Sequence, residues 1–370
     1  MDIYDELGVA KVINGHATVT FLGGSLMPDV VLKKMTEAAR HFVDIDELQR
    51  NVGARIAEWT HNEAAYVSCG AAAGLVLSTA ACITGLDEEK RSKLPYTDGM
   101  KNEVIVHKKG RVSYDFAVRQ AGGKLVEIGS NNGADEAELE NAINYRTVEI
   151  LYFYNATRMD GQVPIERAVE IGKRHGVPVV IDAAAQIPPA ENLWRFTRDM
   201  GASLALFSGG KGLRGPQSSG LIVGNRDLID ACGFNACPRP FIGRPMKAAK
   251  EEIIGLMTAI RWYLDLDHDE LMRTYERQVA YIIESLSDIA NVSAKRGFPS
   301  EAGQPMPRAE IVLDENAIGL SRDELLAKLR AGTPRIALAP AGDAGVYMNP
   351  QTLEPGQEEV IAASIRKILT

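Results

Sequence analysis

The sequence predicts an α/β fold with a mostly parallel central sheet, followed by a smaller α+β domain. Two observations carry this prediction. From about residue 63 to residue 223, short β-rich runs alternate with helical patterns, as in βαβ units around a buried sheet. Beyond Pro245, two long amphipathic helices are followed by short strand-like runs that flank a further helix. The 370 residues suffice for two domains, and we expect an N-terminal segment over 1–45, a large domain over 46–246 and a small domain over 247–370.

The expected elements follow from hydrophobic periodicity, taken in chain order. In the large domain they are strand Ala64–Ser68, helix Ala71–Ile83, strands Glu103–His107 and Lys124–Ile128, helix Asp135–Ile143, strand Val148–Tyr154, helix Ile165–His175, and strands Pro178–Ile181, Leu204–Ser208 and Gly220–Val223. Outside it they are helices Pro28–Phe42, Lys250–Asp265, Asp269–Ala290, Arg322–Ala331 and Gly356–Leu369, with strands Ala309–Leu313 and Arg335–Ala339. Ligands of such sheets bind beyond the carboxyl ends of the strands, so the residues after each strand are candidate site residues.

Composition narrows the function classes. Apolar residues at 45% and charged residues at 24% are ordinary for a globular protein. The net charge of −8 disfavours nucleic acid as a partner. The stretch Ala64–Leu86 is uncharged and long enough to span a bilayer, but small residues dominate it and glycines interrupt it, so we expect a buried strand and helix and no membrane partner.

Cysteine usage and the N-terminus bear on the compartment. The four cysteines lack zinc-site spacing and are too few to cross-link the chain, so no metal is expected: Cys69, Cys82, Cys232 and Cys237. The first residues are acidic, which does not fit a secretory signal. We therefore expect a reduced, cytoplasmic protein.

The segment Phe207-Ser-Gly-Gly-Lys-Gly-Leu-Arg-Gly-Pro-Gln-Ser-Ser-Gly220 follows an expected strand. Its run Gly210–Gly215 matches G-x-G-x-x-G, but a dinucleotide fingerprint must open a helix, and Pro216 and the next strand leave no room for one. It is not a P-loop either, because Gly212 follows Lys211 where Ser or Thr is required. Lys211 is then either a solvated loop lysine or, if desolvation lowers the pKa of its amine, a lysine that forms a Schiff base with an aldehyde.

Asp182 ends another apolar strand, within Val179-Val-Ile-Asp-Ala-Ala-Ala-Gln186. A carboxylate at this place can cap a helix, or it can hold the protonated nitrogen of a pyridine ring. Ala184, two residues later, is small enough for a flat ring to lie against the backbone. Capping is the commoner role of an isolated aspartate at such a place, and the small Ala184 adds support for a planar cofactor.

Val67-Ser-Cys-Gly-Ala-Ala-Ala-Gly74 runs from a strand into the start of an apolar helix. The free N–H groups of Cys69, Gly70, Ala71 and Ala72, together with the helix dipole, would bind a phosphate, although such turns are common in α/β folds. Ser208 could add a hydroxyl to the same phosphate, or it could simply suit a tight turn. A phosphate cradle, a pyridinium acid and an imine lysine together describe a site for pyridoxal 5′-phosphate.

With these residues in place, the sequence resembles the selenocysteine-synthase-like group of fold-type-I pyridoxal-phosphate enzymes, especially its shorter members similar to D-glucosaminate-6-phosphate ammonia-lyase. The matching segments span nearly the whole chain: Tyr4–Gly8, Val12–Asn14, Leu22–Pro28, Phe42–Asp44, Glu47–Gln49, Phe207–Lys211, Gly215–Gln217, Gly220–Gly224, Gly243–Lys247, Lys250–Ile253 and Asn349–Leu353. The resemblance implies an aspartate aminotransferase-like fold and active sites built from two subunits, hence a homodimer or larger assembly.

The resemblance also implies roles for single residues. Lys211 would form the internal aldimine, Asp182 would face the pyridine nitrogen and Ala184 would pack on the ring. Ser68 and the turn Cys69–Ala72, with Ser208, would hold the phosphate. The cations Lys108, Arg244 and Lys247 fall where similar enzymes direct charge toward the substrate, with ordinary surface charge as the alternative. Arg335, after Pro334, lies in a region that often binds the substrate carboxylate.

Some features depart from the group. Bacterial selenocysteine synthases carry an extra N-terminal domain that contacts tRNA; this chain starts with the catalytic unit, and with its net charge of −8 seleniumtransferase activity is not expected. His16 stands where a smaller residue is expected, so it faces the substrate or is a satisfied core histidine. His61 and His107 are expected to be structural. The altered pattern His107-Lys-Lys-Gly-Arg111 puts a sugar-phosphate substrate in doubt.

The chemistry implied is α,β-elimination of a polar amino acid, of the ammonia-lyase or dehydratase type, with Lys211 moving the Cα proton. Transamination, racemisation and aldol cleavage begin the same way and stay open. Two further alternatives are a nicotinamide-dependent oxidoreductase, which needs Gly210–Gly215 to open a helix, and a non-catalytic protein that binds the cofactor.

Overall fold

The computed structural model describes residues 2–370, and the chain divides into two compact units. The larger unit is Met27–Asp265, and the smaller unit combines the residues up to Leu26 with Leu266–Thr370. Each unit has its own sheet and its own hydrophobic core.

The larger unit is built on a seven-stranded sheet with the order β2-β8-β7-β6-β5-β3-β4. Its strands are β2 (Ala64–Ser68), β3 (Glu103–His107), β4 (Lys124–Ile128), β5 (Thr147–Phe153), β6 (Val179–Asp182), β7 (Leu204–Ser208) and β8 (Gly220–Gly224). The strands from β7 to β4 are parallel, and only β8 runs antiparallel to its neighbours. The prediction of an α/β fold with a mostly parallel sheet is therefore confirmed.

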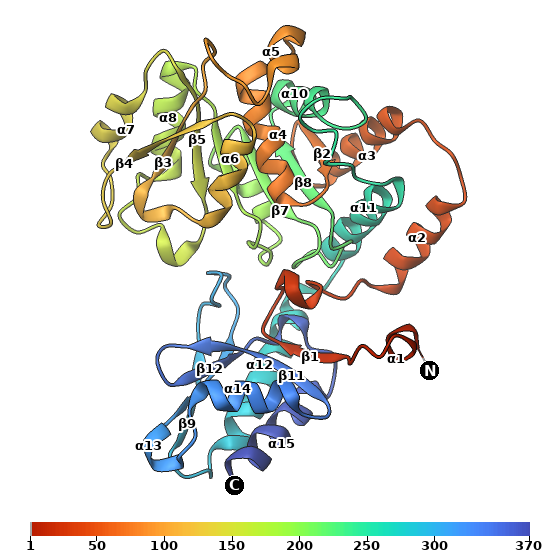
Figure 1. Cartoon of the computed structure of the whole chain (residues 1–370), viewed down its shortest axis with the longest axis vertical. Coiled ribbons are helices and arrows are strands. Elements are labelled where there is room, and N and C mark those ends of the chain that lie inside the picture. The colour runs from red at the N-terminus through yellow and green to blue at the C-terminus, as the bar shows by residue number, and fades with distance from the viewer. Residues whose placement is uncertain (1) are drawn as a thin grey trace. The chain divides into compact units, whose positions relative to one another are not determined.

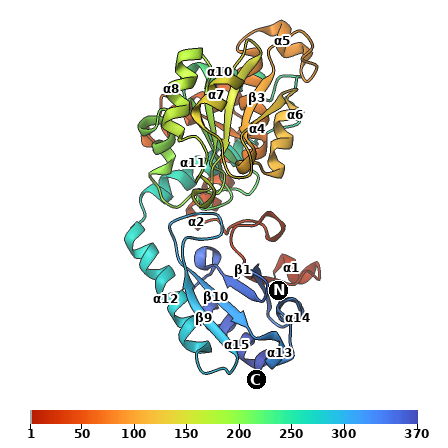
Figure 2. The same cartoon turned by 90° about the vertical axis from the view of Figure 1, so that its left-hand side faces the viewer.

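Helices cover both faces of this sheet, with α4 and α6 on one face and α8 on the other (Figures 1 and 2). The helices of the unit are α2 (Asp29–Ala39), α3 (Ile45–Trp59), α4 (Ala71–Thr84), α5 (Glu88–Lys93), α6 (Phe116–Gln120), α7 (Glu136–Ala142), α8 (Ile165–His175), α9 (Asn192–Trp194), α10 (Arg226–Asn235) and α11 (Lys250–Leu264). Helix α4 is almost wholly buried, which explains why its sequence carries no charge and little amphipathic pattern. Within residues 2–370, no helix is both long and apolar enough to cross a membrane.

The smaller unit has a five-stranded sheet with the order β1-β11-β12-β10-β9. Its strands are β1 (Val12–Gly15), β9 (Val292–Gly297), β10 (Arg308–Leu313), β11 (Arg335–Ala341) and β12 (Gly345–Met348), and its helices are α1 (Ile3–Glu6), α12 (His268–Leu286), α13 (Glu315–Ile318), α14 (Arg322–Ala331) and α15 (Gln357–Leu369). Strand β1 is parallel to β11, and the other pairs are antiparallel. Apolar side chains of α12, α14 and α15 pack on the sheet to form the core.

The two units differ from the expected division of the chain in two places. Helix α11 packs against α2 and α3, so residues up to Asp265 lie with the larger unit and not with a small domain starting at 247. Strand β1 pairs with β11 over three hundred residues away, so the first residues belong to the smaller unit. Neither the packing of α11 nor the pairing of β1 could be predicted from local sequence, because both are contacts between distant segments.

A buried carboxyl group makes the stability of the larger unit depend on pH. Glu149 of β5 is fully buried under α4, where one of its oxygens accepts a 3.0 Å hydrogen bond from Thr79 Oγ1 and the other has no partner among the described residues. Burial raises the pKa of Glu149 to about 7, from 4.5. The folded protein therefore holds a proton that the unfolded chain releases, and the free energy of unfolding falls as pH rises from about 4.5 through 7.

Glu149→Gln should remove this loss, because the neutral amide keeps the acceptor for Thr79. We expect nearly equal urea midpoints for the variant and the wild type at pH 4, and a variant more stable by up to about 3 kcal/mol at pH 8. The exposed Glu58 gives a matched control, Glu58→Gln, with no such difference. An unchanged pH slope in Glu149→Gln would contradict the assignment.

Candidate active site

The ends of several strands bring the predicted residues to one edge of the larger sheet. In the register, Ser68 at the end of β2 and Ser208 at the end of β7 both lie opposite Gly220, the first residue of β8. Asp182 at the end of β6 lies opposite Leu206 of β7. Residues 68, 182 and 208, which the sequence places far apart, therefore stand along the same edge.

The turn from β2 into α4 leaves backbone donors free at this edge. Gly70 caps α4 with a φ of 94°, a conformation that side chains disfavour, and the first intrahelical bond runs from Gly74 N to Gly70 O at 3.0 Å. The N–H groups of Ala71 and Ala72 precede it, so the helix itself cannot satisfy them. Ser68 Oγ donates to Gly70 O at 3.0 Å, which fixes the turn. The result is a concentration of positive potential with no side-chain charge.

Glycine at position 220 is required by close backbone approach. A Cβ atom at Gly220 would lie 2.4 Å from the carbonyl carbon of Gly70. The start of β8 can therefore lie directly against the turn before α4 only because this residue has no side chain. This contact holds the α4 turn against the strand that follows the Lys211 segment.

Asp182 is a buried carboxyl group that accepts one hydrogen bond from the described part of the chain. It is 8% exposed, and its Oδ1 accepts a hydrogen bond of 3.0 Å from Ala184 N. Burial raises the pKa of Asp182 to about 6, while the Ala184 N–H and the charge of Lys211 act in the opposite direction. A buried acid of this kind is stabilised in its charged form by any cation placed beside it.

Lys211 lies in a turn that is closed on itself. Gly209 N donates to Ser219 O and Gly215 N donates to Gly209 O, both at 2.8 Å, and Arg214 N donates to Lys211 O at 2.9 Å. No helix follows, since β8 begins at Gly220, so the structure fits neither a dinucleotide fingerprint nor a P-loop.

The surroundings of Lys211 restrict its position. Its neighbour Gly212 packs tightly against another loop, and the lysine side chain is largely covered. A Cβ at Gly212 would lie 2.1 Å from Ile187 O, so the neighbour of Lys211 must be glycine. The Lys211 side chain is largely removed from solvent, and burial lowers the pKa of its amine, with Asp182 opposing the shift. Ser208 N donates to Ala184 O at 3.2 Å, so the strand end that carries Asp182 lies beside the start of the turn that carries Lys211.

Three predicted substrate cations lie on loops of the larger unit. Lys108 follows β3, and Arg244 and Lys247 precede α11; all three are exposed. Arg244 Nη1 contacts Cys237 Sγ at 3.9 Å. Among residues 2–370, no hydrogen bond or ion pair is described between these cations and Lys211 or Asp182.

His107 lies on the sheet face opposite to α4. Residues alternate between faces along a strand, and Val104 and Val106 pack in the core under α4, so His107 points the other way. Its Nε2 accepts from Val163 N at 3.3 Å, its ring lies 4.7 Å from that of Tyr152, and burial lowers its pKa to about 4. These contacts describe a neutral histidine packed in the core.

His16 and Arg335 belong to the smaller unit, at opposite ends of two paired strands. Arg335 is exposed and opposite Val12, whereas Leu338 is opposite Gly15, the residue before His16. His16 N donates to Asn14 Oδ1 at 3.0 Å, and its ring makes an edge contact with Phe21 at 5.4 Å. Burial lowers the pKa of His16. The structure does not bring these two predicted residues together.

Gln49, to which the sequence analysis gave no role, supports the site from α3. Its side chain is buried, donates to Val67 O at 2.8 Å and accepts from Val67 N at 3.3 Å. The amide thus replaces a neighbouring strand at the outer edge of β2, just before the α4 turn. A polar residue on the buried face of an amphipathic helix was the only signal available.

Comparison with known proteins is consistent with this geometry. The chain is 32% identical to a 5′-C-glycyluridine monooxygenase-decarboxylase from Streptomyces sp., over 99% of this chain and 92% of the relative. It is also 32% identical to the D-glucosaminate-6-phosphate ammonia lyase of Salmonella typhimurium, over 99% of this chain and 98% of the relative. The structure of a D-glucosaminate-6-phosphate ammonia-lyase superposes with a TM-score of 0.88 at 30% identity, covering 100% of this chain and 98% of that one.

Fold and family follow from these matches. An aspartate aminotransferase from Thermotoga maritima shares the fold, with a TM-score of 0.54 at 15% identity, covering 99% of this chain and 94% of that one. The family model described as L-seryl-tRNA selenium transferase matches residues 12–291. The predicted fold-type-I class, enzymatic nature and pyridoxal 5′-phosphate cofactor are thereby confirmed. The chain belongs to the L-seryl-tRNA selenium transferase (SelA) family.

Proposed function

We propose that this protein eliminates a group from Cβ of a polar amino acid and releases ammonia, using Lys211 as the residue that binds the cofactor and moves the Cα proton. The observation that carries the proposal is the buried carboxyl group of Asp182 on a strand end that is hydrogen-bonded to the start of the turn carrying the half-buried Lys211. A charge-free helix N-terminus opens at the same edge. The ammonia lyase among the relatives supports this reaction class.

The residues present fit pyridoxal 5′-phosphate. Free N–H groups over Cys69–Ala72, with Ser68 and Ser208 at the neighbouring strand ends, form a cradle for the phosphate. Asp182 would hold the ring nitrogen in its protonated form, and Ala184 leaves room for the ring face. When bound, the cofactor supplies an aldehyde that condenses with an amine and a ring that accepts the electrons of a broken Cα bond.

The chain's own residues would then do three things. The Lys211 amine, with its pKa lowered by burial, would take the proton when the Cα–H bond breaks. As the Cβ–O bond breaks, the departing hydroxide would take a proton from Lys211 and leave as water. Water then hydrolyses the released enamine to a 2-oxo acid and ammonia. The elimination thus releases one water molecule and the hydrolysis consumes one. Asp182 would keep its negative charge beside the cationic ring throughout.

The substrate we propose carries an anionic group besides its carboxylate. Lys108, Arg244 and Lys247 supply exposed positive charge on loops of the larger unit, in a chain whose net charge is −8. Arg335 and His16 are proposed for the substrate carboxylate and the substrate pocket of the smaller unit. The name of the ammonia lyase relative, which includes a phosphate, is consistent with such a substrate.

The experiment is a panel of D- and L-amino acids with hydroxyl or phosphate groups on Cβ or beyond, assayed for ammonia and 2-oxo acid. We expect equal amounts of the two products from at least one polar amino acid. Carbon dioxide release would favour decarboxylation instead, which the other 32% identical relative suggests. Amino-group transfer to an added 2-oxo acid, inversion of Cα or aldehyde release would identify the transaminase, racemase or aldolase alternatives.

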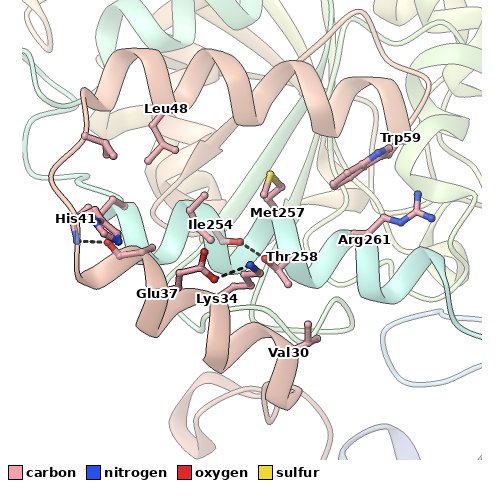
Figure 3. A pocket seen from close by; sticks show the side chains of 13 residues that line it. Val30, Lys34, Glu37, His41, Leu48, Trp59, Ile254, Met257, Thr258 and Arg261 are labelled. Atoms are coloured by element: carbon pink, nitrogen blue, oxygen red, sulfur yellow. Dashed lines mark hydrogen bonds and ion pairs between the residues drawn. The ribbon is translucent and has the colours of Figure 1, made fainter.

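We also propose that the protein works as a homodimer or larger homo-oligomer in the cytoplasm. All four cysteines are free, which is consistent with a reducing compartment. A groove of about 440 Å³ runs between α2 and α3 along α11, from His41 at one end to Trp59 and Arg261 at the other (Figure 3). Phe42 follows His41 and is fully exposed, and Val30, Leu32 and Val43 are each more than 40% exposed. An apolar surface of this kind on a single chain is typical of a subunit interface.

Phe42→Ser should shift the protein toward smaller assemblies, because the serine removes a large exposed aromatic side chain next to the groove. We expect light scattering coupled to gel filtration to show a dissociation constant raised at least about tenfold. Tyr145, which is 79% exposed elsewhere on the larger unit, gives a matched control, Tyr145→Ser, with an unchanged mass. A Phe42→Ser variant that retained the wild-type mass at every dilution would contradict the proposed interface.

A further inference from the structure

The loop between α10 and α11 makes backbone contacts with its own start, although the side chains of Arg244 and Lys247 are exposed. We define the cationic loop as Ala236–Lys247. Ala236 bridges to Gly243, and Gly243 N donates to Asn235 O at 3.1 Å, so the loop returns to its own start. A Cβ at Gly243 would lie 2.3 Å from Asn235 O, which is why this crossing needs glycine.

Arg91 of α5 joins the two sides of this loop. Its guanidinium carbon lies 3.7 Å from the ring centre of Phe234, in the last turn of α10, and 4.2 Å from that of Phe241, in the cationic loop. Its Nη1 donates to Phe234 O at 3.1 Å. A guanidinium between two rings uses its flat face on both sides, which the compact ammonium of lysine cannot do.

Arg91 is an unusual residue to bury for packing alone. It is 8% exposed, and its only ion-pair partner among the described residues is the exposed Glu88 at 3.8 Å. Its Nε atom is buried and no partner is described for it. Burying a charge with incomplete pairing disfavours folding. We therefore expect Arg91 to have a role in the cationic loop besides packing.

The residue whose backbone depends on the Arg91 contacts is Arg244. Its backbone N–H donates to Phe241 O at 2.9 Å, so the ring stacked on Arg91 belongs to the residue that fixes the Arg244 backbone. The Arg244 side chain itself is exposed, and within residues 2–370 its one described partner is the weak contact with Cys237 Sγ. Its direction therefore depends on the backbone and not on a partner. A second anchor, the paired bonds of 3.0 Å from Arg239 to Asp46, holds the middle of the loop independently of Arg91.

We propose that Arg91 is a positioning residue that holds the cationic loop so that Arg244 is directed at an anionic group of the substrate. The inference rests on the proposed function and adds a determinant of substrate specificity to it. Holding an arginine in place before binding strengthens binding because less freedom is lost when the ligand arrives. Arg91 itself does not touch the substrate.

The test compares two probes that differ by one phosphate. Holoenzyme is titrated with serine and with O-phosphoserine, each as the D and L forms, and binding is followed by the change in visible absorbance of the cofactor. For Arg91→Lys we expect the half-saturation concentration of the phosphorylated probe to rise about tenfold, and that of serine to change by less than about twofold. Phe241→Leu, which removes only the ring on the loop, should behave alike. Arg244→Met should lose the same preference, and the double variant of Arg91 and Arg244 should be no worse than Arg244→Met alone.

Arg119 provides a matched control, because its guanidinium lies over the Phe116 ring at 5.0 Å on an exposed surface of the same unit. Arg119→Lys should leave both probes unchanged. Equal weakening of serine and phosphoserine in Arg91→Lys would show a merely structural role and overturn the proposal, as would a wild type without preference for the phosphorylated probe. Failure of the proposed function is distinguishable, because the probes would then still change the visible absorbance of the cofactor, while no amino acid of the panel would yield equal amounts of ammonia and 2-oxo acid.

Discussion

Lys211→Ala is expected to abolish ammonia release, with a fall in kcat of about 10³-fold or more. The reason is that one amine both holds the cofactor and moves the Cα proton, so no other group in the site replaces it. Lys211 is held in place by the turn from Gly209 to Ser219, whose backbone bonds do not involve its side chain. The fold should therefore survive the substitution, and the urea midpoint should be unchanged or raised, because a buried amine is removed.

The measurement is single-turnover ammonia release with the best amino acid of the panel. Lys109 offers a control on the same edge: it is half-buried after β3, its Nζ lies near Gly161, and Lys109→Ala should retain activity within about tenfold. Lys211→Arg keeps a positive charge and should be as inactive as Lys211→Ala. Activity in either Lys211 variant within tenfold of the wild type would contradict its role.

Asp182→Asn is expected to lower kcat by about 10² to 10³-fold, the range typical for loss of one preorganised electrostatic group. The neutral amide cannot hold a proton on the ring nitrogen, so electrons from the broken Cα bond are less stabilised. In the free protein burial raises the pKa of Asp182 to about 6, from 3.8, and a cationic ring beside it would lower that pKa again. Cofactor affinity in the wild type should therefore fall as pH drops below about 6, where the carboxylate is protonated before the ring can bind.

Kinetics and cofactor titration between pH 5 and pH 8 test both statements. Asp199 is an exposed carboxylate of the same unit that pairs with Arg198, and Asp199→Asn should change neither kcat nor the pH dependence of cofactor affinity. Asp182→Asn should bind the cofactor weakly at every pH. A variant that kept the wild-type pH dependence would show that another group controls it.

Much of the larger unit could be predicted because its strands are marked by short stretches of sequence. The strands at 64–68, 103–107, 124–128 and 204–208 coincide with the expected ranges, since each is a buried apolar run bounded by turn residues. Asp182 and Lys211 could be singled out for a related reason: a charged residue directly after such a run must either be solvated or have a function. Their mutual proximity needed the sheet order, which no local pattern contains.

The parts that could not be predicted depend on distant contacts. Strands β1, β9 and β12 had no alternation strong enough to identify them, and β1 is a strand because β11 pairs with it. The position of Arg335 beside Val12, away from His16, follows from that register. Likewise no local pattern identifies Arg91, because its proposed role depends on stacking against Phe234 and Phe241, which lie more than a hundred residues later in the sequence.

The most direct test of the central claim is to reduce the wild-type holoenzyme with borohydride, digest it and map the modified peptide by mass spectrometry. We expect the pyridoxyl group on Lys211 alone, and we expect the visible band to disappear on reduction. Attachment to any other lysine, or a protein that carries no pyridoxyl group after incubation with the cofactor, would contradict it.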